Sequence, residues 1–132
     1  MPAQLIRVLL VEDDPDTLFV IKILLGDMDK LKVEGVRSGE EAIRKVTAAF
    51  MPDLLLMDYM LPVMNGLDTL RELRKLPQTA TTPAILMTAH PPEMSTYKDL
   101  GVVHVIAKPF DPVALSALIE TIWQQHGPTR AQ

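Results

Sequence analysis

Side chains suited to phosphoryl chemistry follow several apolar runs of the chain. Asp58 comes directly after the apolar run 54–57, and a loop with Pro62 and Gly66 follows it. A carboxylate at the carboxyl end of a buried strand lies where open α/β sheets carry out their chemistry. Other runs are followed by acidic, hydroxyl and amine groups: Glu12, Asp13 and Asp14 after the first, Thr88 after another, and Lys108 after the last. Together these side chains indicate a site for a phosphoryl group and a metal ion.

The chemistry of such a site follows from its residue types. Crowded carboxylates raise one another's pKa unless a cation is present, and a hard divalent ion such as Mg²⁺ prefers oxygen ligands. A carboxylate such as Asp58 can act as an in-line nucleophile and form an aspartyl-phosphate. Lys108 and Thr88 could each contact a phosphoryl oxygen, and the metal and the lysine would stabilise the charge that moves during transfer.

An alternation of strands and helices is expected to position these residues. Apolar runs predict strands at 6–11, 32–36, 53–57, 83–87 and 102–106. Caps, prolines and helical spacing predict five helices, which begin at Asp14–Pro15, after Ser38, before Leu67, near Pro92 and at Asp111–Pro112. The first and last helices are expected to turn these residues inward: Leu18, Ile21, Leu25 and Met28, and Leu115, Leu118, Ile119 and Ile122. Such strand–helix pairs imply a parallel sheet covered on both faces, with all strand ends at one edge.

Length and composition exclude several classes of protein. A chain of 132 residues predicts one domain, and its lack of cysteine excludes disulfides, thiolate metal sites and cysteine nucleophiles. The net charge of −4 argues against direct binding of nucleic acid. No run approaches the roughly 20 apolar residues of a membrane span, and the amino terminus does not resemble a signal peptide. We therefore expect a cytoplasmic protein that does not insert into membranes.

The chain resembles the receiver domain of response regulators from bacterial two-component signalling. The resemblance rests on four motifs in order: residues 11–16 (Val-Glu-Asp-Asp-Pro-Asp), 57–66 (Met-Asp-Tyr-Met-Leu-Pro-Val-Met-Asn-Gly), 87–89 (Met-Thr-Ala) and 108–110 (Lys-Pro-Phe). It covers residues 5–126, which leaves residues 1–4 and 127–132 as tails. It implies a flavodoxin-like α/β fold with a five-stranded parallel sheet of strand order 2-1-3-4-5 and five helices.

The resemblance also implies a role for each acidic residue. Asp58 would accept the phosphoryl group, and Glu12 and Asp13 would form the acidic pair. Asp13, Asp58 and the backbone carbonyl of Met60 would bind Mg²⁺ (or Mn²⁺), with Glu12 acting mostly through water. The phosphoryl group would come from a histidine kinase or a histidine phosphotransfer protein, and the signal would pass to a downstream protein through changed protein contacts.

The same resemblance assigns the switch residues. Thr88 would move its hydroxyl toward the phosphoryl group, and Lys108 would contact a phosphoryl oxygen. The bond between Lys108 and Pro109 is expected to be cis.

The family pattern is altered near the predicted output surface. The family often has an aromatic residue three positions before the lysine, where this chain has Val105, a stiff β-branched residue. We hypothesise that phosphorylation is instead read out through the segment from Ala89 to Leu100. Met60 and His90 lie two residues beyond Asp58 and Thr88, positions that influence hydrolysis of the phosphoryl group in the family. Replacement of His90 by alanine is therefore expected to change the lifetime of the aspartyl-phosphate.

Three classes of function remain open from the sequence. The first is the phospho-accepting receiver, which is not a turnover enzyme and either stands alone or belongs to a longer protein. The second is an aspartate-nucleophile phosphatase, which usually has a general acid two residues after the nucleophile; here that residue is Met60, which cannot transfer a proton. The third is a phosphorylation-independent interaction module, against which the intact set of acids, Thr88 and Lys108 argues.

Overall fold

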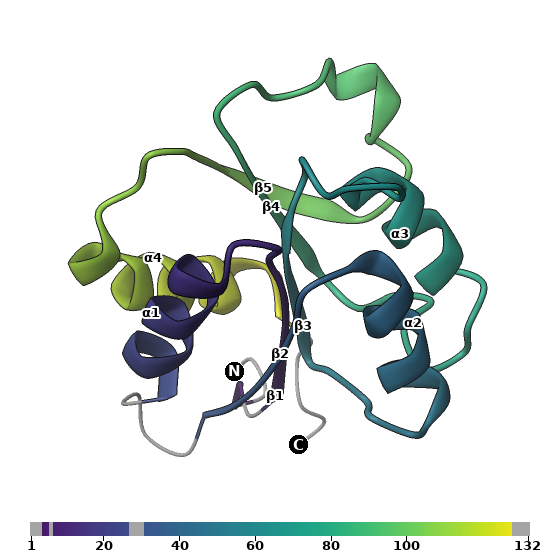
Figure 1. Cartoon of the computed structure of the whole chain (residues 1–132), viewed down its shortest axis with the longest axis horizontal. Coiled ribbons are helices and arrows are strands. Elements are labelled where there is room, and N and C mark those ends of the chain that lie inside the picture. Colours follow the sequence, from purple (N-terminus) through teal and green to yellow (C-terminus); the bar gives the residue numbers. More distant parts are fainter. Residues whose placement is uncertain (1–3, 6, 27–30, 128–132) are drawn as a thin grey trace.

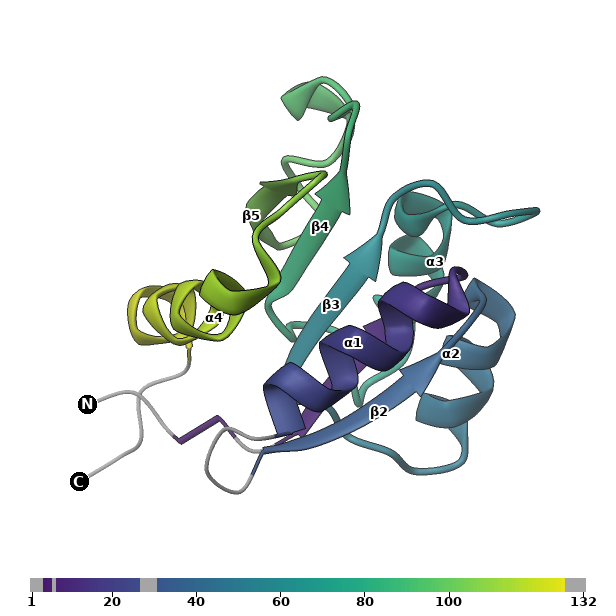
Figure 2. The same ribbon diagram turned by 60° about the vertical axis from the view of Figure 1, so that its left-hand side comes forward.

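The apolar runs form a five-stranded parallel sheet, as their pattern predicts, with the order β2-β1-β3-β4-β5 that the family resemblance implies. A computed structural model describes residues 4–5, 7–26 and 31–127. The strands are β1 (Arg7–Val11), β2 (Lys32–Val36), β3 (Leu54–Asp58), β4 (Ala84–Thr88) and β5 (Val102–Ala107). Figure 2 shows the arrows of β2, β3 and β4 running in one direction, so their carboxyl ends meet at one edge of the sheet.

The central strands are buried on both faces, which explains their nearly continuous apolar sequences. All residues of β3 and β4 are buried, and so are four of the five residues of β1. Asp58 and Thr88 are the last residues of β3 and β4. The sheet therefore holds their backbones rigidly while their side chains stand at its edge.

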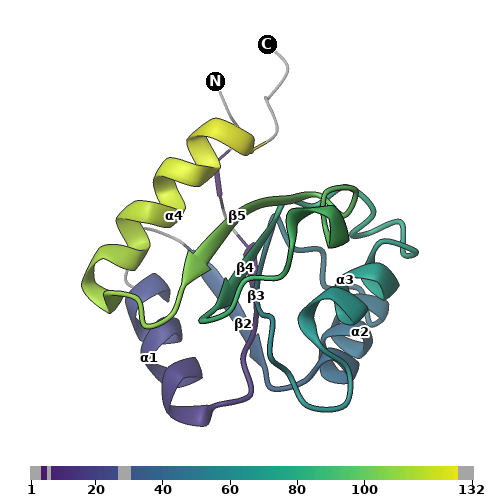
Figure 3. The same ribbon diagram turned by 90° about the horizontal axis from the view of Figure 1, so that it is seen from above.

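Helices cover both faces of the sheet. The helices are α1 (Pro15–Gly26), α2 (Gly39–Thr47), α3 (Gly66–Leu73) and α4 (Pro112–His126). Figures 1 and 3 show α1 and α4 on one side of the sheet and α2 and α3 on the other. On the α1–α4 side, the predicted inward residues Ile21, Leu25, Leu115, Ile119 and Ile122 are buried, and Leu18 and Leu118 pack against them. The predictions for Ile6, Met28 and parts of the two tails lie outside the described residues.

The predicted caps begin the helices. The Asp14 carboxylate accepts a hydrogen bond from the backbone N–H of Thr17, and Ser38 accepts one from Glu41. Asp111 caps α4 by accepting a hydrogen bond from the backbone N–H of Val113. A side-chain oxygen that satisfies a free N–H of the first turn typically contributes about 1 kcal/mol to the stability of a helix. The Asp14 cap begins α1 directly after the acidic residues Glu12 and Asp13.

One of the five predicted helices does not form. The segment between Pro92 and Leu100 contains only one 3₁₀ turn, Met94–Thr96, so the described residues hold four α-helices. Short helices depend on packing, and most side chains of this segment are exposed. Its Glu93 cap makes no side-chain hydrogen bond. Residues that favour the start and the end of a helix are present, but the segment buries too little apolar surface to stabilise a helix between them.

No helix among the described residues has the length and apolar character needed to cross a membrane. The predicted domain bounds of 5–126 stay a prediction.

Candidate functional site

Strand register brings the predicted site residues together at the carboxyl edge of the sheet. Val11 lies opposite Met57, so Glu12 follows β1 at the level where Asp58 ends β3. The backbone N–H of Lys108 donates to the carbonyl of Thr88 over 3.0 Å. Residues from four separate parts of the chain therefore meet at one place.

Three of these residues form a compact acidic cluster. One carboxylate oxygen each from Glu12, Asp13 and Asp58 lies within 4.8 Å of the others. Glu12 is 1% exposed and Asp58 is 4% exposed, whereas Asp13 is partly open to solvent. Since all three donors are hard oxygen atoms, the cluster fits Mg²⁺ or Mn²⁺.

Lys108 provides the positive charge of the site. Its ammonium lies 2.8 Å from Glu12 Oε1 and 3.2 Å from Asp58 Oδ2. Burial by itself would lower the pKa of Lys108, but the hydrogen bond to Glu12 and the negative charges of Asp58 and Glu12 outweigh burial and raise it. Lys108 is therefore a permanent cation between two buried carboxylates.

Glu12 has the most perturbed carboxyl group of the site. The pKa of Glu12 is raised to about 7, chiefly by burial and also by the nearby charge of Asp58, although the hydrogen bond from Lys108 opposes both effects. A single lysine thus does not fully offset the crowding of carboxylates in this cluster. A divalent cation would relieve the remaining repulsion.

The loop after β3 holds Asp58 through its backbone. Asp58 Oδ1 accepts a hydrogen bond of 3.2 Å from the N–H of Met60, whose side chain is exposed. Gly66 donates to the carbonyl of Tyr59 over 2.8 Å. A Cβ atom at Gly66 would lie 2.6 Å from the carbonyl oxygen of Asp58, so only glycine fits without displacing this backbone. The sequence identified Gly66 only as a turn residue.

The structure places the predicted switch residues beside the acids. Thr88 is buried, and its hydroxyl oxygen accepts a hydrogen bond of 3.0 Å from the N–H of His90. The Lys108–Pro109 peptide bond is cis, as the resemblance implies. Val105 lies on β5 and packs against the core on the α2–α3 side.

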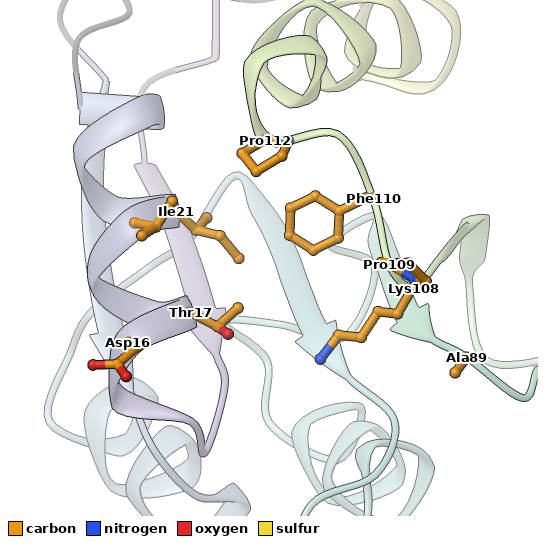
Figure 4. Close-up of a pocket in the computed structure, with 9 residues that line it drawn as sticks. Asp16, Thr17, Ile21, Ala89, Lys108, Pro109, Phe110 and Pro112 are labelled. Atoms are coloured by element: carbon orange, nitrogen blue, oxygen red, sulfur yellow. The ribbon is translucent and has the colours of Figure 1, made fainter.

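A cavity of about 500 Å³ lies next to Lys108, between α1 and the loop that joins β5 to α4. Residues of α1 form one wall, and Phe110 and Pro112 form the other (Figure 4). Ala89 and Pro109 complete the lining near Lys108.

Sequence reasoning missed one residue that contacts the cluster. Arg37 follows β2, and its guanidinium Nε and Nη2 donate to the backbone carbonyl of Asp13 over 3.3 and 3.2 Å. The signal was available, because strand order 2-1 places the end of β2 beside the end of β1.

Comparison with known proteins identifies the class that this fold and site define. A family model described as the response regulator receiver domain matches residues 8–120, and the chain belongs to this family. The transcriptional regulatory protein CpxR of Klebsiella pneumoniae is 39% identical over 118 residues, which are 88% of this chain and 48% of that protein. An uncharacterized 14.6 kDa protein of Leptolyngbya boryana is 32% identical over 115 residues, with 86% of each chain covered.

The solved structures include receivers of the same architecture. The chemotaxis response regulator CheY4 of Vibrio cholerae superposes with a TM-score of 0.80 and 25% identity, covering 90% of this chain and 99% of that chain. This chain spans about half the length of the CpxR proteins it matches. It is thus a signalling receiver domain.

Proposed function

We propose that the chain accepts a phosphoryl group on Asp58 from the phosphohistidine of a histidine kinase or a histidine phosphotransfer protein. The observation that carries the proposal is Lys108, which lies between Asp58 and Glu12 within a cluster of three carboxylates. This set combines a nucleophile, a cation and a place for a second cation. A buried carboxylate that served only as a structural cap would need neither Lys108 nor two further carboxylates beside it.

The reaction uses the residues of the cluster in distinct roles. An Asp58 oxygen attacks phosphorus, the bond from phosphorus to the donor nitrogen breaks, and the imidazole keeps that electron pair. Asp13, Asp58 and the Met60 carbonyl would hold Mg²⁺ or Mn²⁺, with Glu12 acting through water. When bound, this ion neutralises negative charge on the phosphoryl oxygens.

Two further residues complete the proposed site. Lys108 would contact one phosphoryl oxygen, and the Thr88 hydroxyl would turn from the His90 N–H toward another. The new contacts alter the segment that begins at Ala89, and a downstream protein senses that change. The predictions of a cytoplasmic location and of no direct contact with nucleic acid are part of the same proposal.

Intact-mass spectrometry after incubation with Mg²⁺ and acetyl phosphate or phosphoramidate tests this function. We expect one labile phosphoryl adduct in the wild type and in Asp99→Asn, which changes an exposed aspartate, and none in Asp58→Asn. No adduct in the wild type would favour a phosphorylation-independent module. Multiple turnover on a phosphate ester would favour a phosphatase.

A further inference from the structure

Arg37 connects the loop after β2 to the loop that carries the acidic residues Glu12 and Asp13. It follows β2, whereas Asp13 belongs to the loop between β1 and α1. Both guanidinium atoms, Nε at 3.3 Å and Nη2 at 3.2 Å, donate to the same carbonyl oxygen of Asp13. A planar guanidinium can make such a pair of hydrogen bonds, which an ammonium cannot reproduce.

Arg37 is itself held by its neighbours. Its backbone N–H donates to Glu41 Oε2 over 2.8 Å, and Glu41 belongs to the first turn of α2. The N–H of Glu12 donates to the carbonyl of Val36 over 3.0 Å. The end of β2 therefore holds the loop after β1 at two successive residues, Glu12 and Asp13.

The three carboxylates of the cluster differ in how they are held. Glu12 contacts Lys108 and accepts a hydrogen bond from the N–H of Asp14, while Asp58 contacts Lys108 and the N–H of Met60. For Asp13, no hydrogen bond or ion pair to the carboxylate occurs within the part of the chain that the structure describes. The position of the Asp13 carboxylate therefore depends on its backbone.

We propose that Arg37 is a positioning residue that holds the backbone of Asp13 and thereby sets its carboxylate for the divalent cation. The inference rests on the proposed function, because it concerns the same metal site. Loss of a group that orients a metal ligand typically weakens metal affinity by about 10- to 100-fold. Arg37 acts through an exposed backbone contact, so we expect about a three- to tenfold effect on Mg²⁺ affinity.

The charge of Arg37 acts in the opposite direction. A cation beside the cluster repels a divalent ion, although solvent and salt weaken this repulsion. Loss of the hydrogen bonds lowers Mg²⁺ affinity, whereas loss of the charge raises it. Arg37→Lys keeps the charge and loses the paired hydrogen bonds, so it isolates the positioning effect.

Amide chemical shifts of residues 12–14 during a MgCl₂ titration at constant ionic strength measure this effect. The variants are Arg37→Lys, Arg37→Gln and the matched control Arg44→Lys, which makes the same change on the exposed face of α2. We expect about three- to tenfold weaker Mg²⁺ binding for Arg37→Lys, a smaller loss for Arg37→Gln, and none for Arg44→Lys.

A second measurement separates positioning from a folding defect. The rate of phosphorylation of Arg37→Lys by phosphoramidate should return to the wild-type value at saturating Mg²⁺, and unfolding by urea without metal should be nearly unchanged. Wild-type Mg²⁺ affinity in Arg37→Lys would overturn the inference while leaving the proposed function intact. A wild type that does not bind Mg²⁺ would overturn the proposed function and the inference with it.

Discussion

The ammonium of Lys108 lies 2.8 Å from Glu12 Oε1, and this ion pair joins the loop after the first strand to the residue that follows the last strand. The side chain of Lys108 is 25% exposed and that of Glu12 is 1% exposed. Removal of one member of such a buried pair leaves the other charge without compensation. The pair therefore affects stability as well as chemistry.

Replacement of Lys108 by methionine should lower the free energy of unfolding by about 2–3 kcal/mol at pH 8. In the wild type Glu12 is mostly ionised at that pH, because its pKa is about 7 and Lys108 holds that pKa down, so the ion pair that the substitution removes is present. At pH 5 Glu12 is protonated in the folded protein, so the loss should be smaller. Urea unfolding of the metal-free protein at both values measures the difference.

A double-mutant cycle provides the control for this prediction. Glu12→Gln removes the charge that Lys108→Met leaves unpaired, so the double variant should be more stable than the sum of the two single changes predicts. Simple additivity would show that the two side chains do not interact.

Gly66 and Asp58 are related by a close backbone approach. In Gly66→Ala the new Cβ would meet the Asp58 carbonyl oxygen at 2.6 Å and the Tyr59 Cα at 2.9 Å, and neither is a flexible side chain. We expect a loss of about 1–3 kcal/mol in the free energy of unfolding and slower phosphorylation of Asp58. Thermal unfolding and the mass measurement of the phosphoryl adduct check both effects.

Gly26→Ala is the matched control for this substitution. Among the residues that the structure describes, none has an atom within 4 Å of a Cβ built at Gly26, and Gly26 ends α1. Alanine favours a helix over glycine by about 1 kcal/mol, so this variant should be unchanged or more stable. Equal stability of Gly66→Ala and Gly26→Ala would contradict the steric argument.

The sequence predicts most of the fold because the central strands obey a simple physical pattern. A run such as Leu54 to Met57 is apolar at every position, as expected for a strand that is buried on both faces. The site follows from the same pattern, since residues that end parallel strands must meet at one edge. Both inferences depend on residues that are close in sequence or on a general rule of sheets.

The predicted helix between Pro92 and Leu100 is wrong for a reason that sequence patterns do not contain. Pro92 and Gly101 are suitable residues for the start and the end of a helix, and Gly101 has a φ of +72°. The helix also needs apolar contacts, and only Tyr97 and Leu100 of this segment pack against the core. The Arg37–Asp13 contact is a different case, because strand order 2-1 indicates that the ends of β2 and β1 are neighbours but not that the Arg37 guanidinium reaches the Asp13 carbonyl.

Val63 has a backbone conformation that valine rarely adopts. Its φ is +67°, and it is 97% exposed, so few contacts compensate for the strain. The left-handed region costs an L-residue about 1–2 kcal/mol, whereas glycine adopts it freely. Glycine also has more entropy in the unfolded chain, and this offsets part of the stability that relief of the strain provides. We therefore expect Val63→Gly to increase the free energy of unfolding by about 0.5–1.5 kcal/mol in urea unfolding.

Val113→Gly makes the same chemical change in a different conformation. Val113 is 82% exposed in the first turn of α4, where glycine is a poor helix former. We expect this variant to lose about 0.5 kcal/mol in urea unfolding. A loss in both variants would show that the positive φ of Val63 stores no strain.

The segment from Ala89 to Leu100 should report phosphorylation. The Thr88 hydroxyl oxygen accepts a hydrogen bond from the N–H of His90, near the start of this segment. Rotation of the Thr88 side chain toward Asp58 would break that hydrogen bond. At the other end, Arg74 Nε donates to the carbonyl of Leu100 over 2.9 Å. The intervening residues have one 3₁₀ turn and few buried side chains, so little packing resists their movement.

Beryllium fluoride, which mimics a phosphoryl group on a carboxylate, allows this prediction to be tested by amide chemical shifts. We expect larger shift changes for residues 89–100 than for α4, because the Thr88–His90 contact belongs to that segment and Val105 offers no ring that could transmit the change toward α4. Thr88→Val removes the hydroxyl and should abolish the changes in the segment while Asp58 still binds the mimic. Shift changes confined to β5 and α4 would contradict this route, and unchanged responses in Thr88→Val would show that Thr88 does not initiate it.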